Sequence, residues 1–99
     1  MYRVWLHNGC AVASVPKVVA EELIARFGYP VESFIHQDGS EIIITRKKGD
    51  TPTRLIRTSA TTYGFKVPLP EGTLLSFPKL RKLTDDDFEL VYRIDNRRE

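Results

Sequence analysis

The sequence of 99 residues has little cysteine and no long apolar run. Its one cysteine, Cys10, permits no internal disulfide and no multi-cysteine zinc site. No stretch approaches the roughly 18 consecutive apolar residues of a membrane-spanning helix, and the first residues lack the apolar core of a signal peptide. We therefore expect a soluble, cytoplasmic protein.

The chain also lacks a large excess of charge of one sign. Its 15 basic and 13 acidic residues give a net charge of +2, which excludes a histone-like protein or a polybasic tail. A local basic patch on a nearly neutral chain remains compatible with nucleic-acid binding. Hydrophobic residues make up 41% and charged residues 28%, as in ordinary globular proteins, so one compact domain is expected.

No catalytic or metal-binding motif is present. The sequence has no phosphate-cradling glycine loop and no paired catalytic carboxylates, and His7 and His36 stand apart from other ligand types. Cys10 and His7 are residue types that can act as a nucleophile and its base, but a small residue in a turn is the better interpretation of Cys10. Residues 85–87, all aspartate, lack the spaced acidic ligands of a calcium loop and are expected to cap a turn. We expect no enzyme activity and no cofactor.

The first half of the chain alternates between strand and helix patterns. The turn Asn8-Gly9 separates two short apolar strands, and the second strand ends at Val15-Pro16. Apolar residues then recur at helical spacing over residues 17–27, followed by Gly28 as a helix cap. Two further strands, over residues 31–36 and 41–45, are joined at Asp38-Gly39.

The second half repeats this pattern in a weaker form. A shift of 54 residues places Pro16 on Pro70, and it brings apolar positions of the two halves into register. Those in the first half are Ala11, Ala13 and Val15, and those in the second are Phe65, Val67 and Leu69. Strands are expected over residues 54–60, 65–69 and 88–94. The second helix is expected to be short or irregular, because Gly72 and Pro78 both oppose it. The last strand of this half is expected to be missing or reduced to residues 95–99.

The order of these elements resembles the AbrB/MazE swapped-hairpin family. The resemblance rests on the stretch from Trp5 to Pro16, on the helix after it and on the hairpin at Asp38-Gly39, with residues 64–70 resembling a second, degenerate copy. It implies a β-rich α+β barrel built from two tandem modules, residues 1–49 and 53–95, as an intramolecular pseudo-dimer joined near Gly49 to Pro52. It also implies a DNA-binding transcriptional regulator, with double-stranded DNA as the partner.

Basic residues on the strands and turns are the candidate DNA contacts. They are Arg3, Lys17, Arg46, Lys47, Lys48, Arg54, Arg57 and Lys66. The hydroxyl-rich stretch formed by Ser59, Thr61 and Thr62 with Tyr63 could bind phosphates or only hold a turn. Trp5 and the other aromatic residues are expected in the core.

One departure from the family pattern favours an alternative. Some AbrB-type proteins carry arginines in the first turns of the helix, where this chain has Ala20 and Glu21, and Leu74 and Leu75 in the second half. The alternative is a protein-interaction module that keeps the barrel and binds a toxin or a regulatory factor. In either case the protein would be a monomeric pseudo-dimer or a homodimer.

Overall fold

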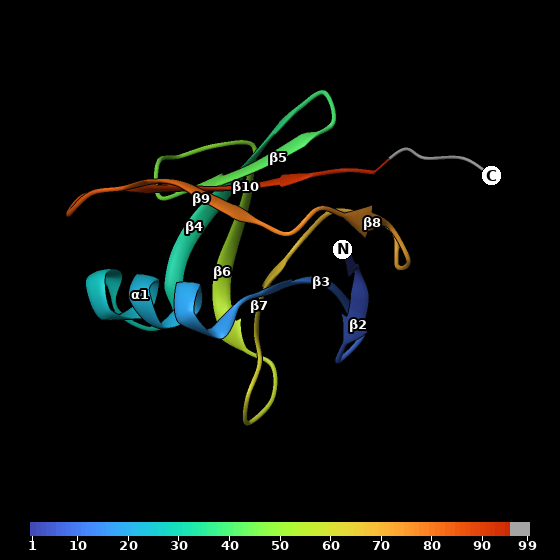
Figure 1. Cartoon of the computed structure of the whole chain (residues 1–99), viewed down its shortest axis with the longest axis horizontal. Coiled ribbons are helices and arrows are strands. Elements are labelled where there is room, and N and C mark those ends of the chain that lie inside the picture. The colour runs from blue at the N-terminus through green and yellow to red at the C-terminus, as the bar shows by residue number, and fades with distance from the viewer. Residues whose placement is uncertain (96–99) are drawn as a thin grey trace.

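A computed structural model describes residues 1–95 of the chain and shows a β-rich α+β fold with one helix over that range (Figure 1). The first half contains β1 (Tyr2–Arg3), β2 (Trp5–His7), β3 (Cys10–Val15), α1 (Lys17–Phe27), β4 (Val31–Asp38) and β5 (Glu41–Thr45). The second half contains β6 (Thr51–Arg57), β7 (Tyr63–Lys66), β8 (Leu74–Leu75), β9 (Lys79–Leu83) and β10 (Phe88–Arg93).

Eight of the strands form one antiparallel sheet that curls into a half-barrel. Its order is β2-β3-β7-β6-β4-β5-β10-β9. Hairpin β6–β7 therefore lies between hairpins β2–β3 and β4–β5, although it follows both in the sequence. The two halves of the chain are interleaved.

The sheet order is nearly unchanged when the two halves exchange places. If β2, β3, β4 and β5 are swapped with β6, β7, β9 and β10, every neighbouring pair recurs except β4–β6. The counterpart of that pair would join the edge strands β2 and β9. Near this position the short strands β1 and β8 pair with each other, and β1 leads into β2 while β8 leads into β9.

The helix has the bounds that the sequence predicts. The Pro16 carbonyl accepts a hydrogen bond from the Ala20 N–H, which makes the first turn. The chain leaves the helix at Gly28, whose φ of 84° favours glycine, and the Gly28 N–H donates to the Ile24 carbonyl. Ala20 and Leu23 on the inner side of the helix are fully buried.

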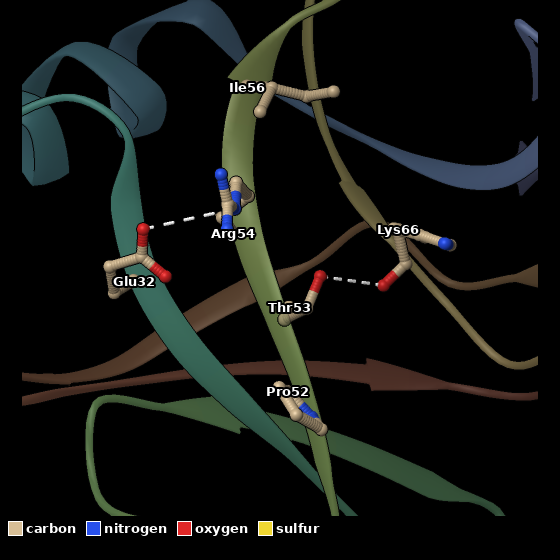
Figure 2. Close-up of a pocket in the computed structure, with 6 residues that line it drawn as sticks. All are labelled: Glu32, Pro52, Thr53, Arg54, Ile56 and Lys66. Carbon is tan, nitrogen blue, oxygen red and sulfur yellow. Dashed lines mark hydrogen bonds and ion pairs between the residues drawn. The ribbon is translucent and has the colours of Figure 1, made fainter.

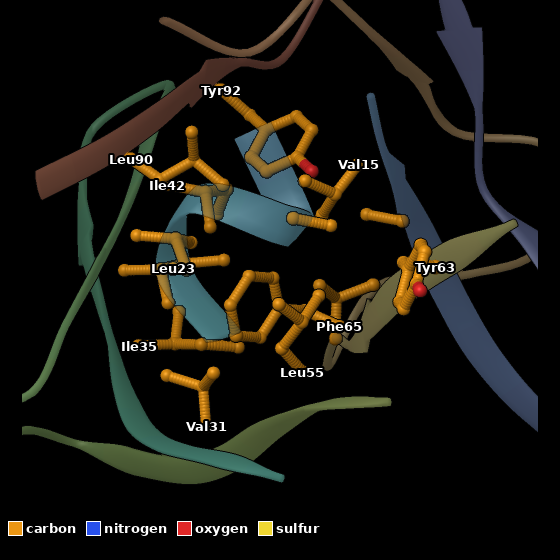
Figure 3. Close-up of a cluster of buried hydrophobic side chains, with 14 of the residues drawn as sticks. Val15, Leu23, Val31, Ile35, Ile42, Leu55, Tyr63, Phe65, Leu90 and Tyr92 are labelled. Carbon is orange, nitrogen blue, oxygen red and sulfur yellow. The ribbon is translucent and has the colours of Figure 1, made fainter. Parts of the chain in front are cut away.

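The core fills the concave side of the sheet (Figure 3). The large buried side chains Phe65, Phe88 and Tyr92 meet Leu23 of the helix in this cluster. The repeated apolar positions of both halves contribute to it. Ala13, Val15, Phe65 and Val67 are core members, and Ala11 and Leu69 pack against them.

Four expectations for the second half need correction. Strand β6 begins at Thr51, and Pro52 pairs with Phe34 of β4, so part of the predicted linker lies within the sheet. Residues 58–60, predicted to extend this strand, lie outside it. The last hairpin is complete, because β9 pairs with β10, and the helix expected as short or irregular is replaced by β8. Of the predicted polar tail, residues 96–99 lie outside the described part of the chain.

Tyr92 of the second half forms a hydrogen bond to the first half across the core. It is fully buried, and its hydroxyl donates a hydrogen bond of 2.6 Å to the Ser14 carbonyl. Burial raises the pKa of this hydroxyl well above its usual value, and the nearby Tyr2 adds to the rise. The neutral form is therefore favoured in the folded state. This contribution to stability is present below about pH 10, where an unfolded tyrosine ionises, and it is lost as the pH rises further toward the folded pKa.

Tyr92→Phe should lower the free energy of unfolding by about 1–2 kcal/mol at pH 7, because the Ser14 carbonyl loses its buried donor. It should also make the loss of stability above about pH 10 shallower, since the ionisable group is gone. Urea unfolding at pH 7 and above pH 10 measures the two effects. Tyr29→Phe is the control, because its hydroxyl accepts the Arg57 N–H at the exposed surface and not in the core. An unchanged alkaline profile in Tyr92→Phe would show that Tyr92 does not dominate this pH dependence.

Gly64 permits the close approach of β7 to β3. A Cβ added there would overlap the Val12 Cγ1 atom and lie 2.9 Å from the Ala13 carbonyl oxygen. We expect Gly64→Ala to destabilise the fold by about 1–3 kcal/mol, as other overpacked positions do. Adding Val12→Ala to this variant should recover part of the loss, because Cγ1 is removed. Additive losses in the double variant, measured by urea unfolding, would contradict the clash.

Candidate nucleic-acid interface

Five side-chain positions form one row across the outer side of the sheet, here called the outer row. Trp5 pairs with Val12, Val12 with Lys66, and Arg54 with Glu32. Lys66 lies opposite Arg54, because the preceding register step pairs Leu55 with Phe65. The sequence neighbours of the row point to the core, as Ala13, Leu55 and Phe65 show, so alternation turns the row outward.

Trp5 lies on this outer side and not in the core, which corrects the sequence-based expectation. It is half-buried and does not belong to the core cluster. Its indole N–H donates to the Ser14 Oγ at 3.0 Å, which fixes the ring against β3. The His7 ring meets it edge to face, with 5.7 Å between the ring centroids. An aromatic surface is thus held in place at one end of the outer row.

The basic end of the outer row borders a shallow depression of about 380 Å³ (Figure 2). Lys66 and Arg54 are exposed there, and Ile56 supplies an apolar wall. The Arg54 guanidinium lies 3.8 Å from the Glu32 carboxylate, and both side chains are more than half exposed. Such an exposed pair contributes at most about 1 kcal/mol, so Arg54 can exchange this partner for another anion.

Arg46 is occupied within the protein and does not join a free basic patch. Its guanidinium lies over the Phe27 ring, 4.6 Å from the centroid, and donates to the Asp86 carbonyl at 3.3 Å. Lys47 and Lys48 beside it are exposed. They border a depression that is also lined by three carboxylates, which reduce the positive potential there. These are Asp38, Asp87 and Glu89.

The remaining candidates are scattered. Arg57 donates to the Ala60 carbonyl at 2.6 Å and lies 5.9 Å from the Tyr63 ring centroid. Lys17 is exposed at the start of α1, and Arg3 is exposed on β1. Of the eight predicted contacts, the described structure therefore places only Arg54 and Lys66 side by side on one sheet face, with Lys47 and Lys48 together in a turn.

The hydroxyl-rich stretch holds its own turn. The Thr62 Oγ1 lies 2.7 Å from the Thr58 Oγ1 and 2.8 Å from the Ser59 Oγ. The Thr61 N–H donates to the same Ser59 oxygen. These hydroxyls bond to one another, so their hydrogen-bonding capacity is used within the turn and does not require a phosphate.

The aspartate turn is likewise structural. Asp87 is 5% exposed, and its Oδ1 accepts hydrogen bonds of 2.8 Å from the backbone N–H groups of Arg46 and Phe88. Arg26 pairs with Asp85 at 3.0 Å, which ties the helix to the same turn. Over residues 1–95, no group of three or more histidine, cysteine, aspartate or glutamate side chains is placed to hold a metal ion.

Comparison with protein-family models, curated proteins and solved structures finds no match to this chain. The AbrB/MazE resemblance therefore stays a prediction that rests on the residues themselves. No helix within the described residues is long and apolar enough to cross a membrane.

Asp87→Ala should lower the free energy of unfolding by about 2 kcal/mol, because two backbone N–H groups lose a charged acceptor. Asp86→Ala is the matched control: it removes the same charge from a neighbouring exposed side chain and should change stability by less than about 0.5 kcal/mol. Urea unfolding compares the two variants. Equal losses would indicate a general charge effect of the turn and not the specific bonds of Asp87.

Proposed function

We propose that the protein is a non-enzymatic DNA-binding regulator built from two tandem AbrB/MazE-like modules, residues 1–49 and 53–95. The observation that carries this proposal is the sheet order, which survives exchange of the two halves except at one strand pair. Interleaved hairpins of this kind are what the resemblance implies for two chains. Here both sets of hairpins belong to one polypeptide.

The same exchange supports an intramolecular pseudo-dimer. Two strand pairs, β3–β7 and β5–β10, map onto themselves when the halves are exchanged. Each of them joins one half of the chain to the other. The β1–β8 pair bridges the region where β2 and β9 would otherwise leave the barrel open. One chain can thereby complete a barrel that a single module cannot.

The DNA-binding surface is assigned to the outer row and the neighbouring strands. Among residues 1–95, Lys66 forms no ion pair, and the ion pair of Arg54 is the weak one with Glu32. Both can approach duplex phosphates, and Arg54 can also reach base edges in a groove. Lys47 and Lys48 supply a second, separate contact, whereas Arg46 and Arg57 are assigned to holding the fold.

A protein-interaction module is the second candidate, and one observation favours it. Arg46, Arg54 and Arg57 all have partners within the chain, which weakens the positive field available to DNA. Large apolar side chains are meanwhile exposed, among them Leu6 at 49% and Phe77 at 64%. Such surfaces suit a toxin or a regulatory factor as partner.

Binding to random duplex DNA at about 50 and 200 mM salt tests the first proposal. We expect affinity to fall steeply with salt, and Arg54→Gln/Lys66→Gln should weaken binding and reduce the log–log salt slope by about 2. Lys47→Ala/Lys48→Ala tests the turn in the same way. Arg46 stays unchanged in all variants because its ring contact supports the fold.

Lys79→Gln/Lys82→Gln is the matched control, since it removes two exposed charges from β9 at the far edge of the sheet. It should leave binding nearly unchanged. Equal weakening by this pair would mean that only net charge matters. No duplex binding at the lower salt would overturn the proposal and favour the protein-interaction module.

A further inference from the structure

The outer row has two chemically different ends. When the first half is superposed on the second at the shift of 54 residues, Val12 coincides with Lys66. In the sheet these two residues pair directly, Val12 on β3 with Lys66 on β7. On the first-half side, the row continues to the aromatic Trp5. On the second-half side, it continues to the cationic Arg54. The pseudo-symmetry of the backbone is thus broken by the side chains, apolar and aromatic on one side and basic on the other.

We infer that the outer row is a binding site for single-stranded nucleic acid, with one base stacked on Trp5 and the backbone phosphates at Lys66 and Arg54. This goes beyond duplex binding, because a stacked base must leave its pair. Proteins commonly hold unpaired bases by combining aromatic side chains, on which bases stack, with basic side chains that contact the backbone phosphates.

Trp5 is suited to stacking because its orientation is fixed. The bond from its indole N–H to Ser14 holds the ring in the outer surface, and the His7 edge contact supports it from the side. Its polar group is therefore satisfied before any ligand arrives. Since the ring is not needed by the core cluster, its partial exposure is available to a base.

The spacing along the row suits a short stretch of nucleic acid. Neighbouring strands lie about 4.8 Å apart, so the backbone of Lys66 lies about 10 Å from that of Trp5, and Arg54 lies about 14 Å away. Val12 between them is buried, and its Cγ1 atom packs over Gly64. Since Gly64 has no side chain, nothing projects from it into the path of a bound strand. Glu32 closes the row with a negative charge, so the phosphate path ends at Arg54.

Trp5 is the only tryptophan of the chain, so its fluorescence reports on this site alone. We expect dT12 and rU12 to quench it on titration at about 50 mM salt, because stacking places a base on the ring. Quenching by both oligomers indicates a site for either kind of single strand, and quenching by one alone restricts it to that kind. No quenching by either would overturn the inference.

Variants measured by anisotropy of labelled dT12 test the roles of the residues. Trp5→Leu should weaken binding by about tenfold or more, whereas Trp5→Phe should retain most of it because a ring remains. Lys66→Gln should weaken binding and reduce the salt slope by about 0.7, and Lys79→Gln should do neither. Equal affinity of Trp5→Leu and the unchanged protein would contradict the stacking.

A duplex of the same length separates this inference from the proposed function. Duplex binding without dT12 or rU12 binding would overturn the single-strand site and leave the duplex proposal intact. Single-strand binding alone would do the reverse. If Trp5→Leu fails to fold, as judged by urea unfolding, the quenching result and Lys66→Gln still decide the matter.

Discussion

The fold depends on strand pairing between the two halves of the chain. Hairpin β2–β3 cannot reach hairpin β4–β5, because hairpin β6–β7 occupies the space between them. The second half likewise cannot complete its own sheet, because β7 pairs with β3 and β10 pairs with β5. Unpaired strand edges bind other strands readily, so a separated half would be prone to association. Interleaving satisfies these edges within one chain.

The core and the outer surface follow from this pairing. Ser14 illustrates the link, because its carbonyl accepts the buried Tyr92 hydroxyl while its side chain accepts the Trp5 N–H on the outer side. One residue of β3 thus connects β10, the core and the proposed binding surface. Gly64 opposite Ser14 lets β3 and β7 approach closely, and the register of this pair places Val12 opposite Lys66 in one row. The surface is therefore a direct product of the packing below it.

Much of the fold could be predicted from the sequence where the signals are local. Pro16 and Gly28 mark the ends of α1, and the apolar stripe Ala11, Ala13, Val15 predicts the inner side of β3. The pairing of Leu74 and Leu75 with β1 depends on a contact across the whole chain, and no local pattern reveals it. The sequence does not predict Pro52 within β6 for a related reason. Proline has no N–H for a strand ladder and therefore indicates a linker, and its pairing with Phe34 is seen only in the folded chain.

The candidate site was harder to predict, because eight basic residues spread along the sequence give no indication of which ones meet. Only the pairing of β6 with β7 brings Arg54 and Lys66 together. Arg46 is held by the Phe27 ring and by the Asp86 carbonyl, and the second of these contacts spans 40 residues of sequence. The outer position of Trp5 did have a signal. The turn Asn8-Gly9 pairs Trp5 with Val12, and Val12 alternates with the predicted core stripe, so both must face outward.

The central claim is that one chain completes the barrel without a second copy. Sedimentation equilibrium of the full chain over a wide concentration range tests it most directly. A constant mass near 11.4 kDa, together with an unfolding midpoint that does not depend on concentration, is the predicted result. A mass of twice that value, with a midpoint that rises with concentration, would show that two chains share the barrel and would contradict the intramolecular pseudo-dimer.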